Sequence, residues 1–151
     1  MGDNSGAAVI VRGLADEEVA SVSEVLGLSR LNQGDGRYLV AWLDTVPVGQ
    51  VHLTDDNPPE MQDLEVRPDY QRRGVATALI AAAEREACER HATKIHLEVS
   101  VTNTGALRLY RRNGYTVVAQ EPRRVDGIVH IRTGPIEVHD VLLSMEKELD
   151  Q

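Results

Sequence analysis

Residues 71–76 combine residue types that suit the binding of an anion. They read Gln-Arg-Arg-Gly-Val-Ala and stand where a short apolar run, stopped by Pro68, gives way to a helical pattern. A helix N-terminus exposes unpaired N–H groups and a partial positive charge, so two arginines there make sense when an anion docks on them. Gly74 removes a side chain where a ligand approaches the backbone, and Ala76 keeps another position small. The spacing predicts a cradle for a pyrophosphate group.

Other interpretations of this glycine are possible. A glycine before an alanine-rich helix is also typical of a tight turn with close helix packing. A Rossmann fingerprint needs an initial Gly-x-Gly turn, which is absent here. A Walker loop needs Gly-Lys followed by Ser or Thr, which occurs nowhere in the chain. Two interpretations of residues 71–76 therefore remain open, a phosphate cradle and a structural turn. The Rossmann and Walker motifs, the two commonest phosphate motifs, are excluded.

The pattern resembles the signature of the GNAT family of N-acetyltransferases. That signature is Gln or Arg, two variable residues, Gly, one variable residue, then Gly or Ala, and it is met by Gln71, Gly74 and Ala76. The resemblance continues through residues 97–118, where three residues have matching spacing: Asn103, Tyr110 and Gly114. It implies an α/β fold with a mixed, mostly antiparallel central sheet, a splayed parallel pair and flanking helices. We expect a flexible leader at residues 1–6 and a single N-acetyltransferase domain at 7–151.

The resemblance also implies that acetyl-CoA is the co-substrate. The backbone of residues 64–66 is expected to pair with the amide arm of coenzyme A, and a main-chain N–H near Val66 to polarise the thioester carbonyl. Asn103 is expected to form a hydrogen bond with this arm. The alternative is that Asn103 only caps the following helix, and one side chain can serve both roles. The full set of expected cofactor-binding residues is Leu64, Glu65, Val66, Gln71, Arg72, Arg73, Gly74, Val75, Ala76, Thr77, Asn103, Leu107 and Tyr110.

Direct transfer of acetyl from a thioester to an amine needs an acid for the departing thiolate. Tyr110 lies where the family carries its tyrosine, and a phenol with a reference pKa of about 10 matches a departing alkyl thiolate. The alternative is a core tyrosine on a helix stripe shared with Leu107. We therefore expect Tyr110 to be the general acid.

Several carboxylates compete for the role of general base. Glu98 comes first, because its placement twelve residues before Tyr110 resembles the ribosomal-protein N-terminal acetyltransferases. Glu60 comes second, because its position resembles that of the glutamate in histone-acetylating members. Glu65 and Asp63 follow, and strand alternation places them on the face opposite Glu60 unless a bulge intervenes. Two alternatives stay open. These carboxylates can simply lie on a solvated strand face, or a chain of water molecules can take the place of a direct base.

Composition limits the partners. The 151 residues carry a formal net charge of −8, which disfavours nucleic acid and mildly favours a cationic partner. The acceptor is expected to be an amine of a small molecule or a protein, and a homodimer paired through residues 138–145 is possible. The single cysteine, Cys88, suits a reducing cytoplasm, and neither a signal peptide nor a membrane span is evident.

Metal binding is not expected. The five histidines show no paired ligand spacing, and no cysteine cluster accompanies them: His52, His91, His96, His130 and His139. The rival function is a domain that binds acyl-CoA as a sensor or regulator without catalysis. A protein-interaction module with a structural Gly74 turn is a further alternative.

Periodicity and turn residues predict the elements that position these groups. Strands are expected at 8–11, 38–43, 46–53, 60–66, 94–101, 115–119 and 138–145, and helices at 15–26, from 75 onward and at 104–113. The 38–43 and 46–53 strands should form a hairpin around Asp44. Residues 121–135 read as a long loop that contains a short strand at 128–131.

Overall fold

The computed structural model describes residues 8–31, 33–118, 122–131 and 133–150. The expected leader at 1–6 therefore lies outside the described residues. The chain divides into two compact units. The first unit comprises residues up to Ile95 together with the last three, and the second comprises His96–Glu148. Each unit is described by itself.

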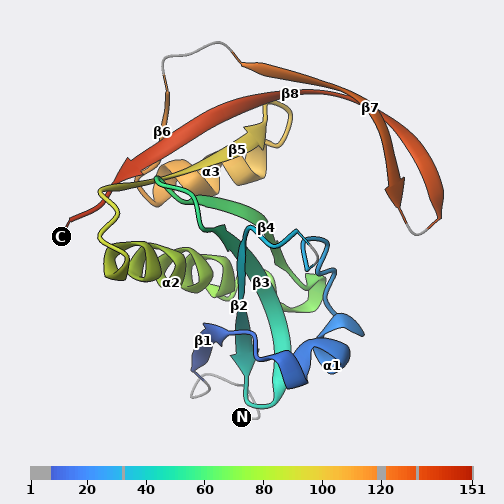
Figure 1. Ribbon diagram of the computed structural model, residues 1–151, viewed down its shortest axis with the longest axis vertical. Helices are drawn as coiled ribbons and strands as arrows, with labels where there is room; N and C mark the ends of the chain where they lie inside the picture. The colour runs from blue at the N-terminus through green and yellow to red at the C-terminus, as the bar shows by residue number, and fades with distance from the viewer. Residues whose placement is uncertain (1–7, 32, 119–121, 132, 151) are drawn as a thin grey trace. The chain divides into compact units, whose positions relative to one another are not determined.

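An antiparallel sheet forms the centre of the first unit (Figure 1). Its strands are β1 (Val9–Gly13), β2 (Gly36–Leu43), β3 (Val46–Thr54) and β4 (Glu60–Val66), paired in chain order. The predicted hairpin is confirmed, and its turn places Asp44 at φ 54°. Asp tolerates this left-handed backbone better than most residues, which explains why the chain reverses there.

The long helix α2 (Val75–Glu89) covers one face of this sheet. Leu79 and Val75 lie directly over Gly49, where an added Cβ would stand 3.1 and 3.2 Å from their side-chain carbons. Both side chains are almost fully buried. The helix begins immediately after Gly74, as the sequence predicts. The position of the cradle is thus set by close packing between α2 and β3.

The opposite face of the sheet is covered by the segment that follows β1 (Figure 1). Val22 and Leu26 form a buried cluster with Val40 on this face. The helix expected at 15–26 is shorter than predicted: a 3-10 turn, η1 (Asp16–Glu18), precedes the single turn of α1 (Val19–Ser23). A five-residue helix leaves most of its end groups without helical partners, so burial of Val22 rather than helix propensity holds it.

The second unit contains most of β5 (Lys94–Ser100), then α3 (Thr104–Arg112), β6 (Thr116–Val117), β7 (Arg123–Ile131) and β8 (Gly134–Glu148). In strand order β8 lies beside β5 and β6, and it also pairs with β7. Gly114, at φ 96°, follows the end of α3 as a left-handed stop. Residues 138–145 pair with β6 and β7 of the same chain, and the homodimer stays a prediction.

The prediction for residues 121–135 was wrong in its main feature. Residues 128–131 do lie in a strand, but among the described residues of this stretch that strand is not short: β7 is nine residues long and pairs with β8 from Arg123↔Leu142 to Ile131↔Gly134. Pro135 and Gly134 suggested a break, yet they stand at the start of β8, where a proline is tolerated. The strand expected at 115–119 is shorter than predicted, because β6 comprises only Thr116–Val117. The last residue of the expected strand lies outside the described part of the chain.

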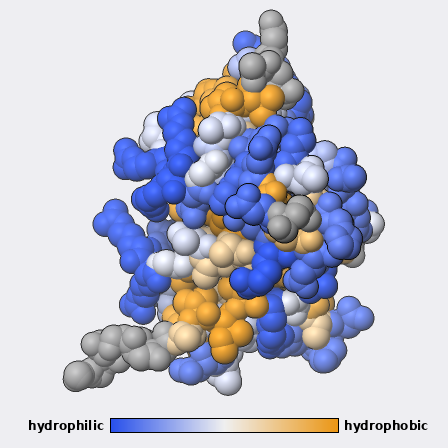
Figure 2. All heavy atoms as spheres, turned by 90° about the vertical axis from the view of Figure 1, so that its left-hand side faces the viewer, coloured by the Kyte–Doolittle hydropathy of each residue, from blue (hydrophilic) through white to orange (hydrophobic). Residues whose placement is uncertain are grey.

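Hydrophilic side chains cover much of the face shown in Figure 2, and apolar side chains form separate patches on it. Individual apolar side chains are nevertheless exposed, with Ile128 in β7 at 67% and Ile10 in β1 at 60%. Within the described residues, none of the helices has the length and apolar character that crossing a membrane requires.

Candidate active site

The loop between β4 and α2 has the backbone of an anion-binding turn. It starts with a 3-10 turn, η2 (Pro68–Tyr70), and then places Arg72 at φ 65° and Gly74 at φ 80°. Arg73 between them does not have a positive φ. Alternation of this kind turns successive N–H groups toward one point and forms a concave anion site. The first amides of α2, at Val75, Ala76 and Thr77, add donors because no helical carbonyl precedes them.

The space in front of this loop is open. A Cβ built on Gly74 would have no heavy atom within 4 Å, so a ligand can approach the backbone there. Arg72 and Arg73 are exposed, and neither forms an ion pair with a carboxylate of the described residues. The guanidinium groups of Arg73 and Arg67 lie 5.5 and 5.4 Å from the centroid of the Tyr70 ring. A cationic and unobstructed turn of this kind fits a pyrophosphate.

The backbone of β4 is also suited to hold a ligand beside the cradle. The Arg67 N–H donates to the Val48 carbonyl at 2.9 Å, so Val66, which faces Gly49, falls in a non-hydrogen-bonded pair of the antiparallel ladder. Its N–H therefore points away from β3, as expected for a donor to a thioester carbonyl. The Val66 carbonyl accepts a hydrogen bond from Gln71 Nε2 at 3.2 Å, which ties the loop to the end of the strand.

A β-bulge in β4 changes which carboxylates share a face. Gln50 pairs with Glu65 and His52 with Gln62, so β4 has one residue more than β3 between these pairs. The extra residue is accommodated at Asp63, whose φ is 55°. Strict alternation would put the side chains of Glu65 and Glu60 on opposite faces of the sheet. The bulge instead places both on the same face as Gln50, which corrects the expectation from simple alternation.

Asp63 is the centre of a hydrogen-bond cluster on this face. One of its carboxylate oxygens, Oδ2, accepts bonds from three side chains: Tyr38 Oη, Gln50 Nε2 at 3.0 Å and Ser29 Oγ at 3.2 Å. Burial, together with the bond to Asp63, raises the pKa of Tyr38 above its usual value, so its hydroxyl remains a donor.

The segment after α1 joins this cluster mainly through its backbone. The Gln50 amide also donates to the Gly27 carbonyl at 2.8 Å, and the Arg30 N–H donates to the Tyr38 hydroxyl at 2.9 Å. Sequence reasoning did not identify Tyr38 or Gln50. No motif marks either residue. Tyr38 pairs with His52 and Gln50 with Val40, so the two residues share one face of β2 and β3 at neighbouring register positions, and only that register would have linked them.

Glu65 lies at the edge of the cluster with an altered pKa. Its Oε2 would be 3.9 Å from a Cβ added to Gly27, so the carboxylate faces the segment after α1. Partial burial first, and then the negative charge of Asp63, raise the pKa of Glu65 above the ordinary value. A carboxylate with a raised pKa is a better proton acceptor than an ordinary one.

In the second unit, α3 carries the other expected site residues. The Asn103 side chain accepts a hydrogen bond from the Ala106 N–H at 3.1 Å, so Asn103 caps the helix and its NH₂ group is left for another acceptor. Tyr110 is 9% exposed, and its ring lies 6.0 Å from that of Tyr115. Burial raises the pKa of Tyr110, so the phenol keeps its proton at neutral pH.

Glu98 is occupied by an ion pair. Both of its carboxylate oxygens accept hydrogen bonds from Arg123 in β7, at 2.8 and 2.7 Å. These bonds hold the pKa of Glu98 below its usual value. A paired carboxylate with a lowered pKa accepts a proton poorly, which weakens the case for Glu98 as a base.

Within the described ranges there is no group of three or more His, Cys, Asp or Glu side chains arranged to hold a metal ion. The expectation that no metal takes part in the reaction remains a prediction.

Comparison with known proteins identifies the family. The sequence profile of the acetyltransferase (GNAT) family matches residues 12–115, and the chain therefore belongs to this family. It is 33% identical over 90 residues to an acetyltransferase from Pectobacterium atrosepticum, in an alignment that covers 59% of this chain and 64% of that protein. The chain thus spans less than two thirds of the length of this relative.

Solved structures show the same fold. The ribosomal-protein-S18-alanine N-acetyltransferase from Escherichia coli superposes with a TM-score of 0.71 at 14% identity, covering 95% of this chain and 96% of that one. A putative streptothricin acetyltransferase from Bacillus anthracis, solved in complex with acetyl coenzyme A, superposes with a TM-score of 0.71 at 16% identity. This superposition covers 94% of this chain and 100% of that one. These similarities confirm the predicted α/β fold class.

The Asp63 cluster leads to a stability prediction. Tyr38→Phe removes one donor to Asp63 and leaves the Arg30 N–H without its acceptor, so the free energy of unfolding should fall by about 1–3 kcal/mol. Urea denaturation measures this change. Tyr70→Phe is the matched control, because the Tyr70 hydroxyl makes no hydrogen bond with the described residues and its loss should change little. Equal stabilities of the two variants would contradict the importance of the cluster.

Proposed function

We propose that this protein transfers an acetyl group from acetyl-CoA to a primary amine. The amine nitrogen attacks the thioester carbonyl directly, the C–S bond breaks, and the acetyl group passes to nitrogen without a covalent enzyme intermediate. A carboxylate takes the proton from the acceptor ammonium, and Tyr110 gives a proton to the departing thiolate. The second proton, which the nitrogen loses as it becomes an amide, restores Tyr110. Membership of the GNAT family supports the general activity, and the residues of this chain support the individual steps.

The observation that carries the proposal is the open, cationic turn at residues 72–76. Its left-handed backbone at Arg72 and Gly74 gathers N–H groups, and the space in front of Gly74 is free. The Val66 N–H next to it points away from β3. One ligand that needs both features is a pyrophosphate joined to an amide-containing arm, which describes coenzyme A.

Tyr110 has the properties of the acid. Its buried phenol has a raised pKa and stays protonated at neutral pH, and the thiolate is basic enough to take that proton. Its hydroxyl makes no hydrogen bond with the described residues, so it is available to a ligand. Leu107 lies one turn before it on the same helix and is also buried.

For the base we favour Glu65 over Glu98. Glu65 has a raised pKa and faces the segment after α1, whereas Glu98 is held by Arg123. Glu60 lies on the same face of β4 and is the second choice. The acceptor is an amine of a small molecule or of a protein, and the acidic groups on this face of β4 favour a cationic one.

Substitution of Gly74 tests the cradle. Gly74→Asp and Gly74→Asn have nearly the same shape, and both residues tolerate a positive φ. Only Asp adds a negative charge next to the pyrophosphate, so it should weaken acetyl-CoA binding by about tenfold or more relative to Asn. Calorimetric titration measures both. A wild-type protein that folds but does not bind acetyl-CoA would overturn the proposed function.

Removal of the Tyr110 hydroxyl tests the acid. Tyr110→Phe should lower kcat by about 10²–10⁴-fold and leave the affinity for acetyl-CoA and the melting temperature nearly unchanged. The rate of transfer is measured as the release of the coenzyme A thiol from acetyl-CoA in the presence of a panel of amines. Full activity in the variant would show that another group protonates the thiolate. Acetyl-CoA binding without turnover by the wild type for any amine would favour the sensor alternative.

Matched glutamate variants test the base. Glu65→Gln should lower kcat/KM by about 10²-fold, and Glu98→Gln should retain most of the activity. Because the pKa of Glu65 is raised, the wild type should lose activity on acidification at a higher pH than an ordinary carboxylate requires. Below the pKa the residue is protonated and cannot accept a proton. The acidic limb of kcat/KM should be absent from Glu65→Gln, and a limb that persists in this variant would assign the base elsewhere.

A further inference from the structure

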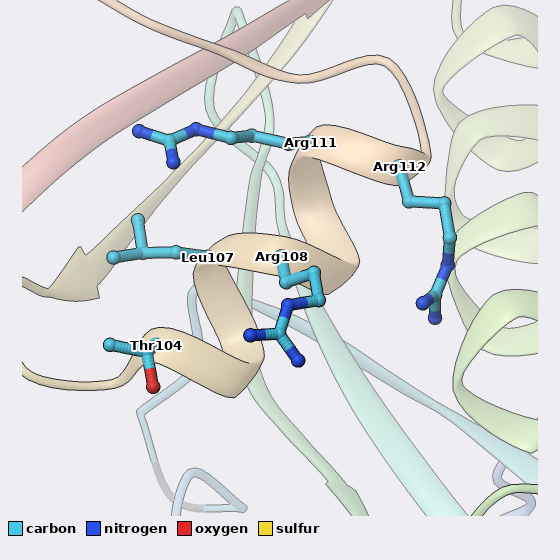
Figure 3. Close-up of a pocket in the computed structure, with 5 residues that line it drawn as sticks. All are labelled: Thr104, Leu107, Arg108, Arg111 and Arg112. Carbon is cyan, nitrogen blue, oxygen red and sulfur yellow. The ribbon is translucent and has the colours of Figure 1, made fainter.

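The hollow beside α3 in the second unit has a volume of about 510 Å³. It is lined by five residues of this helix: Thr104, Leu107, Arg108, Arg111 and Arg112. Figure 3 shows that its arginines do not converge, because Arg111 extends to one side of the helix while Arg108 and Arg112 extend in other directions. Guanidinium groups that point apart do not form a site for one anion, and no ligand is assigned to this hollow.

An unsatisfied polar atom in the first unit lies beside the proposed base. Gln50 in β3 has no exposed surface, and its Nε2 donates to the Gly27 carbonyl at 2.8 Å and to Asp63 Oδ2 at 3.0 Å. Both partners are acceptors, which fixes the orientation of the amide and uses both of its hydrogens. The remaining atom, Oε1, is buried and accepts no hydrogen bond from the described residues. A buried oxygen without a donor is unfavourable.

The donors in the Asp63 cluster are already in use. The hydroxyls of Tyr38 and Ser29 both donate to Asp63 Oδ2, and the Arg30 N–H donates to the Tyr38 hydroxyl. A hydroxyl has only one hydrogen to give, so neither can serve Gln50 without leaving Asp63. The donor for Gln50 Oε1 has to come from another side chain on this face.

Glu65 is the neighbour that can supply this donor. It is the register partner of Gln50 between β4 and β3, and such partners hold their Cβ atoms about 4.5–5.5 Å apart on one face. Both side chains also approach Gly27, because Glu65 Oε2 would be 3.9 Å from a Cβ added there and Gln50 bonds its carbonyl. An ionised carboxylate only accepts hydrogen bonds, whereas a protonated one has an O–H to donate. Gln50 Oε1 is therefore matched to the protonated form of Glu65.

We propose that Gln50 is a positioning residue for the proton that Glu65 takes from the acceptor amine. The proposal rests on the proposed function, in which Glu65 is the favoured base. As the ammonium N–H bond breaks, a Glu65 O–H bond forms, and this O–H is then donated to Gln50 Oε1. The nitrogen keeps the electron pair that attacks the thioester. Glu65 keeps contact with solvent, to which the proton passes afterwards.

The surroundings of Glu65 act in the same direction as this hydrogen bond. Partial burial first, and the negative charge of Asp63 second, raise the pKa of Glu65. A hydrogen bond that only the protonated carboxyl can donate raises the pKa further. The other titratable or charged residues on the elements around it are Glu60 of β4, His52 of β3, Tyr38 of β2, and Glu24 and Arg30 of the segment after α1.

Carbon-13 NMR titration of the glutamate carboxyl groups tests the proposal without depending on catalysis, and Glu65→Gln assigns the resonance. Gln50→Met replaces the amide by an apolar group of similar size, and the midpoint of the Glu65 titration should move to lower pH by about half a pH unit or more. A less polar environment alone would move it to higher pH. The control Tyr38→Phe also removes a donor to Asp63 but keeps Gln50 Oε1, so its midpoint should stay close to that of the wild type.

A second measurement needs no substitution at Gln50. In the wild type, the side-chain carbonyl resonance of Gln50 should move downfield on acidification with the same midpoint as Glu65, because the oxygen gains a hydrogen bond. Glu65→Gln should abolish this titration. In the activity assay, the acidic limb of kcat/KM should move to lower pH in Gln50→Met by the same amount as the NMR midpoint. Circular dichroism confirms that each variant is folded.

The outcomes separate this proposal from the proposed function. Three results would overturn the role of Gln50 and leave the acetyltransferase proposal intact: an unchanged or higher Glu65 midpoint in Gln50→Met, an equal fall in Tyr38→Phe, or a Gln50 resonance that does not follow Glu65. A folded wild type that does not bind acetyl-CoA would overturn the proposed function and the catalytic role of Gln50 together. The NMR midpoints would then still decide whether Gln50 accepts the hydrogen bond of Glu65.

Discussion

The left-handed backbone of Asp63 in β4 is the constraint on which the rest of the first unit depends. A non-glycine residue at φ 55° inside a strand is unfavourable unless its surroundings hold it. Here three side chains from β2, β3 and the segment after α1 converge on a single carboxylate oxygen. Asp is one of the few residues that combines tolerance for this backbone with the needed acceptor. The bulge is therefore fixed by polar contacts as well as by the ladder.

Two consequences of the bulge bear on chemistry. It brings Glu60, Glu65 and Asp63 toward one face of β4, so negative charge collects where alternation would have divided it. It also sets the phase of the ladder beyond it, and this phase decides that the Val66 N–H points away from β3. A single extra residue thus determines both the charge of one face and the direction of a main-chain donor.

Sequence patterns predicted the elements whose signals are local. The boundary at Gly74, the Asn103 cap and the hairpin at Asp44 each depend on residues within a few positions of one another, and each was found where expected. The cradle residues were predicted from the same kind of local signal, because their chemistry depends mainly on backbone and on residue size, and their role in binding stays a prediction.

Features that depend on distant residues were not readable. The pairing of β7 with β8 was missed because Asp-Gly and Gly-Pro look like loop residues until the partner strand is known. The Tyr38–Asp63 bond joins residues 25 positions apart, and nothing in either neighbourhood indicates it. Glu98 ranked first as a base on spacing alone, since its pairing with Arg123 across another 25 positions has no sequence signal.

The segment after α1 contacts the cluster in a way that bears on how the protein can evolve. It offers a carbonyl at Gly27 and an amide at Arg30, groups that every residue except proline supplies in full. Ser29 alone contributes a side chain there. Most substitutions in this segment therefore leave its attachment to the sheet intact. New side chains can therefore be accommodated beside Glu65 without loosening the attachment of this segment to the sheet.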